Sequence, residues 1–255
     1  MNLQSGSKVK TVKRIGFIGT ALVSVLVTFM ACNNTQAPPK MREPIVIATP
    51  YDSPSISNSG DKGSADEILS LAKEKTTDDL LAAFRSESTA AAKYAAFSKR
   101  ADKDGYHQVA LLFKAASTTE IIHASNHNAV LDESGVKVAP VNPEYTVKTT
   151  RENLQEAIKC ERYEASTMYP ELLKDAEESG SQLAVLSLTY ALKVEKKYQR
   201  LYENALIATD NLRTKELASE YYICPTCGNT FEVKPSQRCG VCMTDSGKFI
   251  KIIGL

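Results

Sequence analysis

The chain has 255 residues, with 31 basic and 30 acidic side chains and no tryptophan. This length can form one sizeable core and one small additional module. Because the charges nearly cancel, no broad electropositive surface indicates nucleic-acid binding, and we expect no nucleic-acid partner. Strand-like alternation is scarce before the C-terminal segment, which predicts a mainly α-helical protein.

The N-terminus has the pattern of a secretory signal. Four basic side chains between positions 8 and 14 precede an uncharged run over 15–31, which ends in Ala31 directly before Cys32. The sequence Phe-Met-Ala-Cys resembles a bacterial lipoprotein cleavage box. We therefore expect residues 1–31 to be a signal peptide and Cys32 to carry the lipid, which predicts a lipid-anchored protein of the cell envelope. A single transmembrane anchor is the alternative, although this run is short for a span.

Residues 32–65 hold five of the ten prolines, together with Ser, Asn and Gly. This composition is typical of a flexible linker. We expect it to separate the folded part of the chain from the membrane.

Four long helical patterns follow and predict a bundle over residues 66–212. The first helix is expected to begin after the polar run at 76–79, since apolar side chains then recur at steps of three and four until Gly105. The other three helices are expected over about 106–131, 147–178 and 182–208. Two tight turns and a long Pro-containing crossover at 135–146 are typical of a ferritin-like four-helix bundle. Pro170, inside the third helix, should bend it or mark a local irregularity.

Carboxylates lie on the inner stripes of these helices. The first helix contributes Glu87, the second Glu120 and His123, the third Glu161 and Glu164, and the fourth Glu195. Each of them, taken alone, is ordinarily a solvated helix charge. A buried carboxylate, however, must be paired or bound to a metal ion, because desolvation costs several kcal/mol. Carboxylates and an imidazole that face one bundle core are suitable ligands for two iron or manganese ions.

The C-terminal segment contains two Cys-x-x-Cys knuckles. They are formed by Cys224 and Cys227 and by Cys239 and Cys242. Four thiolates in two short knuckles predict a tetrahedral metal site. Disulfides are the alternative outside the cytoplasm, and the spacing alone does not distinguish iron from zinc.

In this order and spacing, the motifs resemble the rubrerythrin family. The resemblance is carried by "AAFRSESTAAAKYAAFSKRADKDGYHQVALLF", "EIIH", "CERYEASTMYP" and "DAEESG", followed by the two knuckles, and it extends from about residue 77 to 255. It implies a ferritin-like di-iron bundle and a rubredoxin-like domain over 218–255. The metal ligands implied by the resemblance are Glu87, Glu120, His123, Glu161, Glu164 and Glu195 in the bundle, and Cys224, Cys227, Cys239 and Cys242 around one iron.

Two tyrosine roles and an assembly also follow from the resemblance. Tyr94 and Tyr169 match positions beside the iron pair, in a redox or hydrogen-bonding role, with core packing as the alternative. A homodimer is the implied assembly.

The sequence departs from the family pattern in its fourth helix. The family has Glu-x-x-His there, whereas this chain has Tyr198 three positions after Glu195. Tyr198 could bind iron as a phenolate, or a water molecule or His127 could take the place, although His127 is expected to be a surface residue. In the second knuckle, Gly240 and Met243 replace the Pro and Gly that rubredoxins often have.

The resemblance implies reduction of hydrogen peroxide to water. Electrons would come from an unidentified donor protein and be relayed by the cysteine-bound iron. Two alternatives remain open: iron oxidation and storage as in ferritins, and a non-catalytic metal-binding protein whose second bundle site has degenerated.

Overall fold

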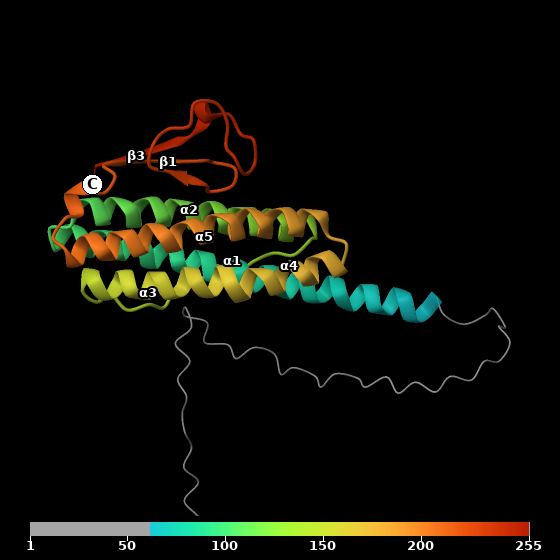
Figure 1. The fold of residues 1–255 in the computed structure, drawn as a ribbon. Coiled ribbons are helices and arrows are strands. Elements are labelled where there is room, and N and C mark those ends of the chain that lie inside the picture. Colours follow the sequence, from blue (N-terminus) through green and yellow to red (C-terminus); the bar gives the residue numbers. More distant parts are fainter. Residues whose placement is uncertain (1–61, 255) are drawn as a thin grey trace, which may run out of the picture.

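The structure, a computed structural model, describes residues 62–254. The predicted signal peptide, the acylated Cys32 and nearly all of the predicted linker lie outside this range. Long helices run side by side, and a small sheet-containing domain lies on one face of them (Figure 1). The predicted mainly α fold is confirmed. Within the described residues, no helix has the length and apolar character that a membrane span requires.

Over residues 62–210, the bundle is built from five α-helices and one π-helical segment. They are α1 (Lys62–Lys103), α2 (His107–Glu133), α3 (Thr150–Tyr163), the π-helical segment Glu164–Met168, α4 (Tyr169–Glu178) and α5 (Gln182–Asp210). Together, α3, the π-helical segment and α4 form the third helix expected from the sequence. The second and fourth predicted helices correspond to α2 and α5.

Helix α1 begins well before the predicted start, which was wrong. Its 42 residues include the stretch 64–75, whose side chains are almost all exposed, and this end of the helix extends past the bundle (Figure 1). The polar run at 76–79 does not interrupt the helix, because the Thr76 hydroxyl donates back to the Ala72 carbonyl at 3.0 Å. The preceding residues are rich in Ala, Leu, Glu and Lys, which favour helix.

The irregularity expected at Pro170 is present as the π-helical segment Glu164–Met168. Pro170 lies in the first turn of α4, where a missing backbone N–H is tolerated. A π turn widens the helix by one residue and is frequent at functional sites. Here it begins at Glu164, one of the predicted metal ligands.

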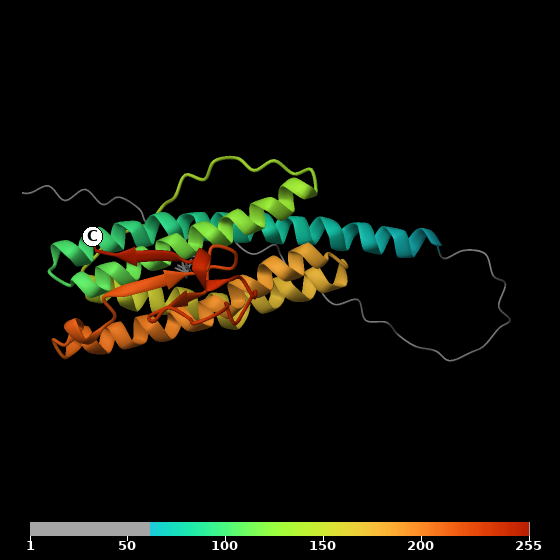
Figure 2. The same cartoon turned by 90° about the horizontal axis from the view of Figure 1, so that it is seen from above.

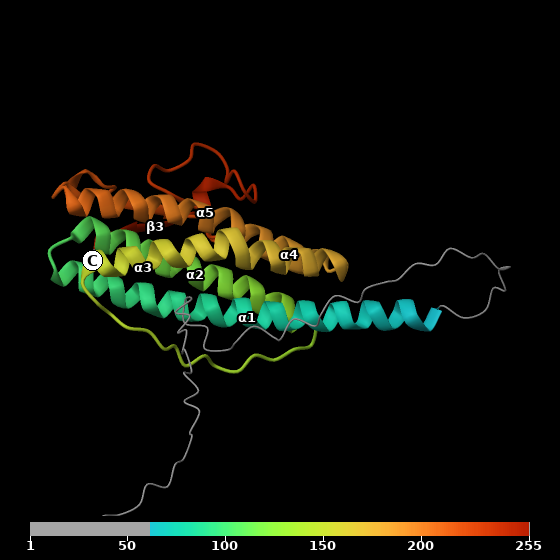
Figure 3. The same ribbon diagram turned by 60° about the horizontal axis from the view of Figure 1, so that its bottom comes forward.

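Tight turns and one crossover connect the helices. Gly105 (φ +82°) and Gly180 (φ +72°) supply the left-handed backbone of the two tight turns. The crossover between α2 and α3 contains no helix or strand, and Figure 3 shows it as a long loop along the bundle. It ends at Thr149, whose side chain accepts the Glu152 N–H while the Glu152 carboxylate accepts the Thr149 N–H, a capping box that starts α3.

Apolar clusters fill both ends of the bundle and leave a polar level between them. One cluster includes Tyr94, Phe97 and Phe113, and the other includes Leu80 and Leu131. Along α1, Glu87 lies between Leu80 of one cluster and Tyr94 of the other. The predicted carboxylates therefore occupy a middle level of the bundle, enclosed by packed side chains at both ends.

The C-terminal domain contains a three-stranded antiparallel sheet of order β2-β1-β3. Its strands are β1 (Glu220–Ile223), β2 (Thr230–Phe231) and β3 (Ile250–Ile253). Seen from above, the domain lies over α2 and α5 (Figure 2). The first cysteine knuckle connects β1 to β2. In the second knuckle, Met243 has φ +64°, the left-handed conformation that explains why glycine is usual at this position.

Candidate metal centres

The six predicted bundle ligands come together at the middle level of the bundle. All of them are buried: Glu87, Glu120, His123, Glu161, Glu164 and Glu195. Their ligand atoms form two groups, and within each group all atoms lie within 4.8 Å of one another. The groups are Glu87, Glu120, His123 and Glu195, and Glu161, Glu164 and Glu195. Because Glu195 belongs to both groups, the arrangement suits two neighbouring ions that share a carboxylate.

The carboxylate groups are short of positive charge. Buried oxygens of Glu87, Glu120, Glu161 and Glu195 have no hydrogen-bond partner among the described residues. Burial, and for several of them repulsion from neighbouring carboxylates, raises the pKa of Glu87, Glu120 and Glu195 well above the usual range. Unpartnered buried oxygens need an explanation, and bound cations provide one. Oxygen and imidazole donors fit iron.

Two tyrosines are hydrogen-bonded to Glu161 and Glu87, which are called the outer carboxylates below. The Tyr94 hydroxyl donates to Glu161 Oε1 at 2.5 Å, and the Tyr169 hydroxyl donates to Glu87 Oε1. In both carboxylates the second oxygen is the one that has no partner within the described part of the chain. Burial raises the pKa of both tyrosines, so both phenols remain protonated donors. Each tyrosine thus occupies one carboxylate oxygen and leaves the other for a metal ion.

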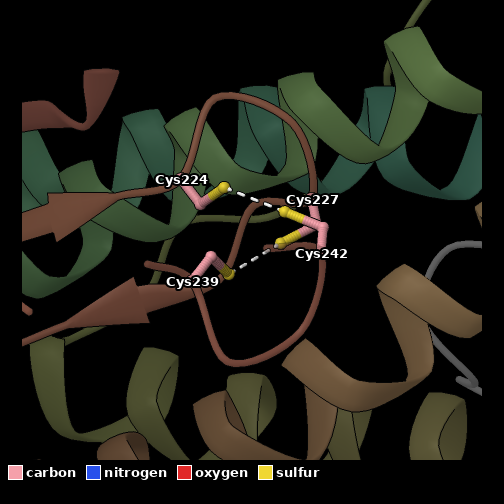
Figure 4. Close-up of side chains that lie close together, drawn as sticks. All are labelled: Cys224, Cys227, Cys239 and Cys242. Carbon is pink, nitrogen blue, oxygen red and sulfur yellow. Dashed lines mark hydrogen bonds between the residues drawn. The ribbon is translucent and has the colours of Figure 1, made fainter. Parts of the chain in front are cut away.

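The four cysteines of the C-terminal domain turn their sulfur atoms toward one another (Figure 4). The Sγ atoms of Cys224 and Cys242 are 3.4 Å apart, and those of Cys227 and Cys239 are 3.5 Å apart. These distances exceed a covalent S–S bond, so disulfides among these four cysteines are excluded. Hydrogen bonding from Cys227 lowers the pKa of Cys224 to about 4. The group fits one tetrahedral metal ion.

His123 joins the two centres. Its Nδ1 lies 2.9 Å from Glu195 Oε1 and 3.1 Å from Glu120 Oε2. Its Nε2 lies 3.3 Å from the backbone carbonyl oxygen of Cys227. Gly228 makes this approach possible, because a Cβ atom there would lie 2.7 Å from His123 Nε2. One imidazole therefore contacts a carboxylate of the bundle and the backbone of a cysteine knuckle.

A polar cluster fastens the knuckle to the bundle beside His123. The Thr119 hydroxyl lies 3.1 Å from the Gly228 carbonyl oxygen, and the Lys197 ammonium donates to Asn229 Oδ1 at 2.9 Å. The same ammonium lies 4.1 Å from the centroid of the Phe231 ring. These contacts come from α2 and α5, the two helices that the domain covers (Figure 2).

Comparison with known proteins gives the arrangement a family. The family model described as rubrerythrin matches residues 78–206, just over half of the chain. The chain belongs to the rubrerythrin family. Rubrerythrins use a di-iron carboxylate site and an iron bound by four cysteines, and this chain has a buried Glu/His cluster and a four-cysteine cluster that fit these two centres.

Individual rubrerythrins resemble the chain over most of their length. Rubrerythrin-2 of Clostridium acetobutylicum is 31% identical over 182 residues, which cover 71% of this chain and 98% of the relative. Nigerythrin of Nitratidesulfovibrio vulgaris is also 31% identical and is covered to 85%. The structure of nigerythrin in its fully reduced, all-ferrous state superposes with a TM-score of 0.63 at 29% identity, covering 69% of this chain and 86% of that one. The predicted ferritin-like bundle with a rubredoxin-like domain is thus confirmed.

Tyr198, the residue that replaces the family histidine, points to the domain junction. Its hydroxyl lies 3.0 Å from Thr119 Oγ1 and 2.8 Å from Thr230 Oγ1. Burial raises the pKa of Tyr198 well above its usual range, which favours the neutral phenol over the phenolate. The geometry thus favours a link between bundle and rubredoxin-like domain over the predicted metal ligand.

His127 is buried, so its expected place on the surface was wrong. It lies one helical turn after His123 and therefore on the same face of α2, a signal that the sequence offered. Its Nδ1 is 2.8 Å from Ser187 Oγ, and its Nε2 is 3.3 Å from the Tyr169 hydroxyl. His127 thus contacts Tyr169, the tyrosine whose hydroxyl donates to Glu87.

Sequence reasoning also missed the residues that support the centres. Thr119 and Thr230 at the junction, and Ser187 behind His127, are ordinary hydroxyl residues with no spacing signal. Lys93 is 2% exposed, and its ammonium, 4.0 Å from Glu156, adds a buried positive charge beside Tyr94. In the sequence, only the position of Lys93 directly before Tyr94 indicated that it lies near the bundle site.

The raised carboxyl pKa values predict an unusual pH dependence for the metal-free protein. Above the usual carboxyl pKa of 4.5, the native state holds protons that the unfolded chain has lost. The Tm of the metal-free protein should therefore fall as the pH rises from about 5 to about 8. At about pH 8, Glu120→Leu should raise the Tm of the metal-free protein, because it removes an uncompensated buried charge that costs about 1–4 kcal/mol. The same substitution should weaken iron binding. Calorimetry and iron analysis check both effects. A Tm that rises over this range would contradict the account.

The position of Tyr198 predicts different results for two substitutions. Tyr198→Phe should leave bundle iron unchanged, because the hydroxyl serves the junction, and should destabilise the docked domain by about 1 kcal/mol. Tyr198→His should increase ferrous iron in the second bundle site by restoring an imidazole. Anaerobic ferrous titration of the full chain checks both, with the cysteine-bound iron counted separately by its red absorbance after a sample is oxidised. Loss of one bundle iron in Tyr198→Phe would instead make the phenol a ligand.

Proposed function

We propose that the chain reduces hydrogen peroxide to water, with electrons relayed from the cysteine-bound iron to the di-iron site, in defence against oxidative stress. The observation that carries the proposal is the position of His123, which contacts Glu195 on one side and the Cys227 carbonyl on the other. An electron-transfer module placed directly on the bundle centre serves a redox cycle. Iron storage needs no such module, so this contact favours peroxide reduction over a ferritin-like function.

The reaction requires two electrons and two protons for each peroxide. Ferrous iron in the bundle supplies the electrons when it is bound. The buried carboxylates would hold the two ions, and the hydroxyls of Tyr94 and Tyr169 donate to Glu161 and Glu87. Packed side chains enclose the site at both ends, and the carboxylates would shift as ligands while the charge of the centre changes.

Electrons would return to the bundle through a short route made of covalent bonds, one hydrogen bond and one close contact. It runs from the Cys227 sulfur through its own backbone carbonyl to His123 Nε2, and across the imidazole to Nδ1. From Nδ1 the nearest carboxylate oxygens, on Glu195 and Glu120, are 2.9 and 3.1 Å away. Gly228 keeps this route short, since any larger side chain would push the knuckle away.

The second candidate function is non-catalytic metal binding with a degenerate second site. The observation that favours it is the Tyr198 hydroxyl, which two threonines engage instead of the carboxylate centre. It predicts fewer than two bundle irons per chain and no peroxide consumption. Counting bundle iron per chain and measuring peroxide consumption on the same protein therefore distinguish the two functions.

Peroxide consumption through the relay should depend on Gly228. Reduced parent protein mixed with peroxide should consume it, and its cysteine-bound iron should turn red as it is oxidised. Gly228→Ala should keep both kinds of iron but slow oxidation of the cysteine-bound iron by about tenfold or more, the equivalent of about 1.4 kcal/mol in the barrier. Stopped-flow absorbance follows the colour, and a peroxide electrode follows the substrate.

Two alanine variants provide matched controls. Gly240→Ala lies in the other knuckle, where a Cβ meets nothing within 4 Å, and should behave like the parent. Gly105→Ala has the same backbone strain as Gly228→Ala but no Cβ contact, so it reports strain alone. If the parent consumes no peroxide, the proposed reaction is wrong. If Gly228→Ala matches Gly240→Ala in rate, the relay is wrong.

We also propose that the protein is a homodimer anchored in the cell envelope by a lipid on Cys32. The support for the anchor is the sequence pattern alone, because these residues lie outside the described range. An envelope location would require a redox protein as electron donor in place of a soluble nicotinamide pool. Mass spectrometry of the native protein should find a lipid-modified N-terminus at Cys32 and no residues 1–31. An intact Met1 would contradict the proposal.

A further inference from the structure

His127 is a buried imidazole that belongs to neither metal-ligand group. It lies between Ser187 of α5 and Tyr169 of α4, with Nδ1 2.8 Å from the serine oxygen and Nε2 3.3 Å from the phenol oxygen. Beyond the phenol is Glu87, whose Oε1 accepts the Tyr169 hydroxyl. A continuous line of four side chains therefore runs from α5 to a metal ligand on α1.

The direction of every hydrogen bond in this line follows from its inner end. Glu87 as an ionised ligand can only accept, so the single proton of the Tyr169 hydroxyl is used on it. The phenol oxygen must then accept from His127, which requires the proton on Nε2. Burial, followed by the neighbouring His123, lowers the pKa of His127 to about 3, so the ring is neutral and carries one proton. Nδ1 is consequently bare and accepts from the Ser187 hydroxyl.

We propose that His127 is a positioning residue that fixes Tyr169 as the donor to Glu87 Oε1 and thereby leaves Glu87 Oε2 as the oxygen for iron. Among the described residues, Oε2 is the Glu87 oxygen that has no hydrogen-bond partner. A phenol that accepts a hydrogen bond also donates more strongly, which holds the carboxylate more firmly. The inference rests on the proposed function only in that both concern the same metal site.

The line of hydrogen bonds from His127 reaches Glu87 and has no counterpart at Glu161 among the described residues. Tyr94 holds Glu161 in the same way that Tyr169 holds Glu87, but no imidazole of the described residues is hydrogen-bonded to the Tyr94 hydroxyl. The tyrosine on the Glu87 side thus has a hydrogen-bonded imidazole that the tyrosine on the Glu161 side lacks. Residues behind a metal ligand commonly change metal affinity by about 10- to 100-fold when they are replaced.

The first measurement uses protein loaded with Zn²⁺, a diamagnetic ion that keeps Glu87 ionised, and no peroxide. The chain has three histidines, so ¹⁵N labelling of histidine gives three rings to assign. His127 should be the Nε2–H tautomer at neutral pH, with a bare, hydrogen-bonded Nδ1. Ser187→Ala should shift the Nδ1 resonance while the Nε2 proton stays. An Nδ1–H tautomer, or a charged ring, would overturn the proposal.

The second measurement is anaerobic ferrous binding to the full chain. His127→Leu should weaken binding at one bundle site by about tenfold, and His127→Gln, whose amide can still donate to Tyr169, should recover most of it. In a Tyr169→Phe background, His127→Leu should cause no further loss, because it acts through the phenol. Unchanged affinity in His127→Leu, or equal additive losses in the double variant, would overturn the proposal. Peroxide consumption can fail or succeed independently of these results.

Discussion

The structure depends on the free-energy cost of burying five carboxylates together in the middle of a helical bundle. Glu87, Glu120, Glu161, Glu164 and Glu195 are at most 2% exposed. Ionised together without cations, they would repel one another in a medium that screens them poorly. Bound iron removes this repulsion, and protons can remove it only by cancelling the charges. Metal binding, protonation and stability are therefore one coupled property of this protein.

The surrounding residues act as supports for that level. Tyr94 and Tyr169 each occupy one oxygen of an outer carboxylate and direct the other toward the centre. The π-helical segment begins at Glu164 and ends directly before the first turn of α4, which contains Pro170. On the outer face, Gly228 allows the cysteine knuckle to reach His123. The same imidazole thus serves the carboxylate level and the contact between domains.

Much of this arrangement was predictable from the sequence, because it depends on local periodicity. Helical spacing identifies the stripes that carry Glu87, Glu120, His123 and Glu195, and paired Cys-x-x-Cys knuckles specify their own geometry. The early start of α1 was missed because Thr76 satisfies its hydroxyl within the helix, so a polar residue did not end it. Contacts between distant segments were not predictable in this way. Nothing local shows that Tyr198 would meet Thr230, since the two residues are brought together only when the C-terminal domain docks on α5.

The central claim is that one imidazole joins the two iron centres within a single folded unit. The most direct test is the dependence of the oxidation of the cysteine-bound iron on protein concentration, after fully reduced protein is mixed with excess peroxide. A relay through His123 predicts a first-order rate constant that is the same at every protein concentration. A rate constant that rises in proportion to protein concentration would show electron transfer by collision between separate molecules, and would contradict the account.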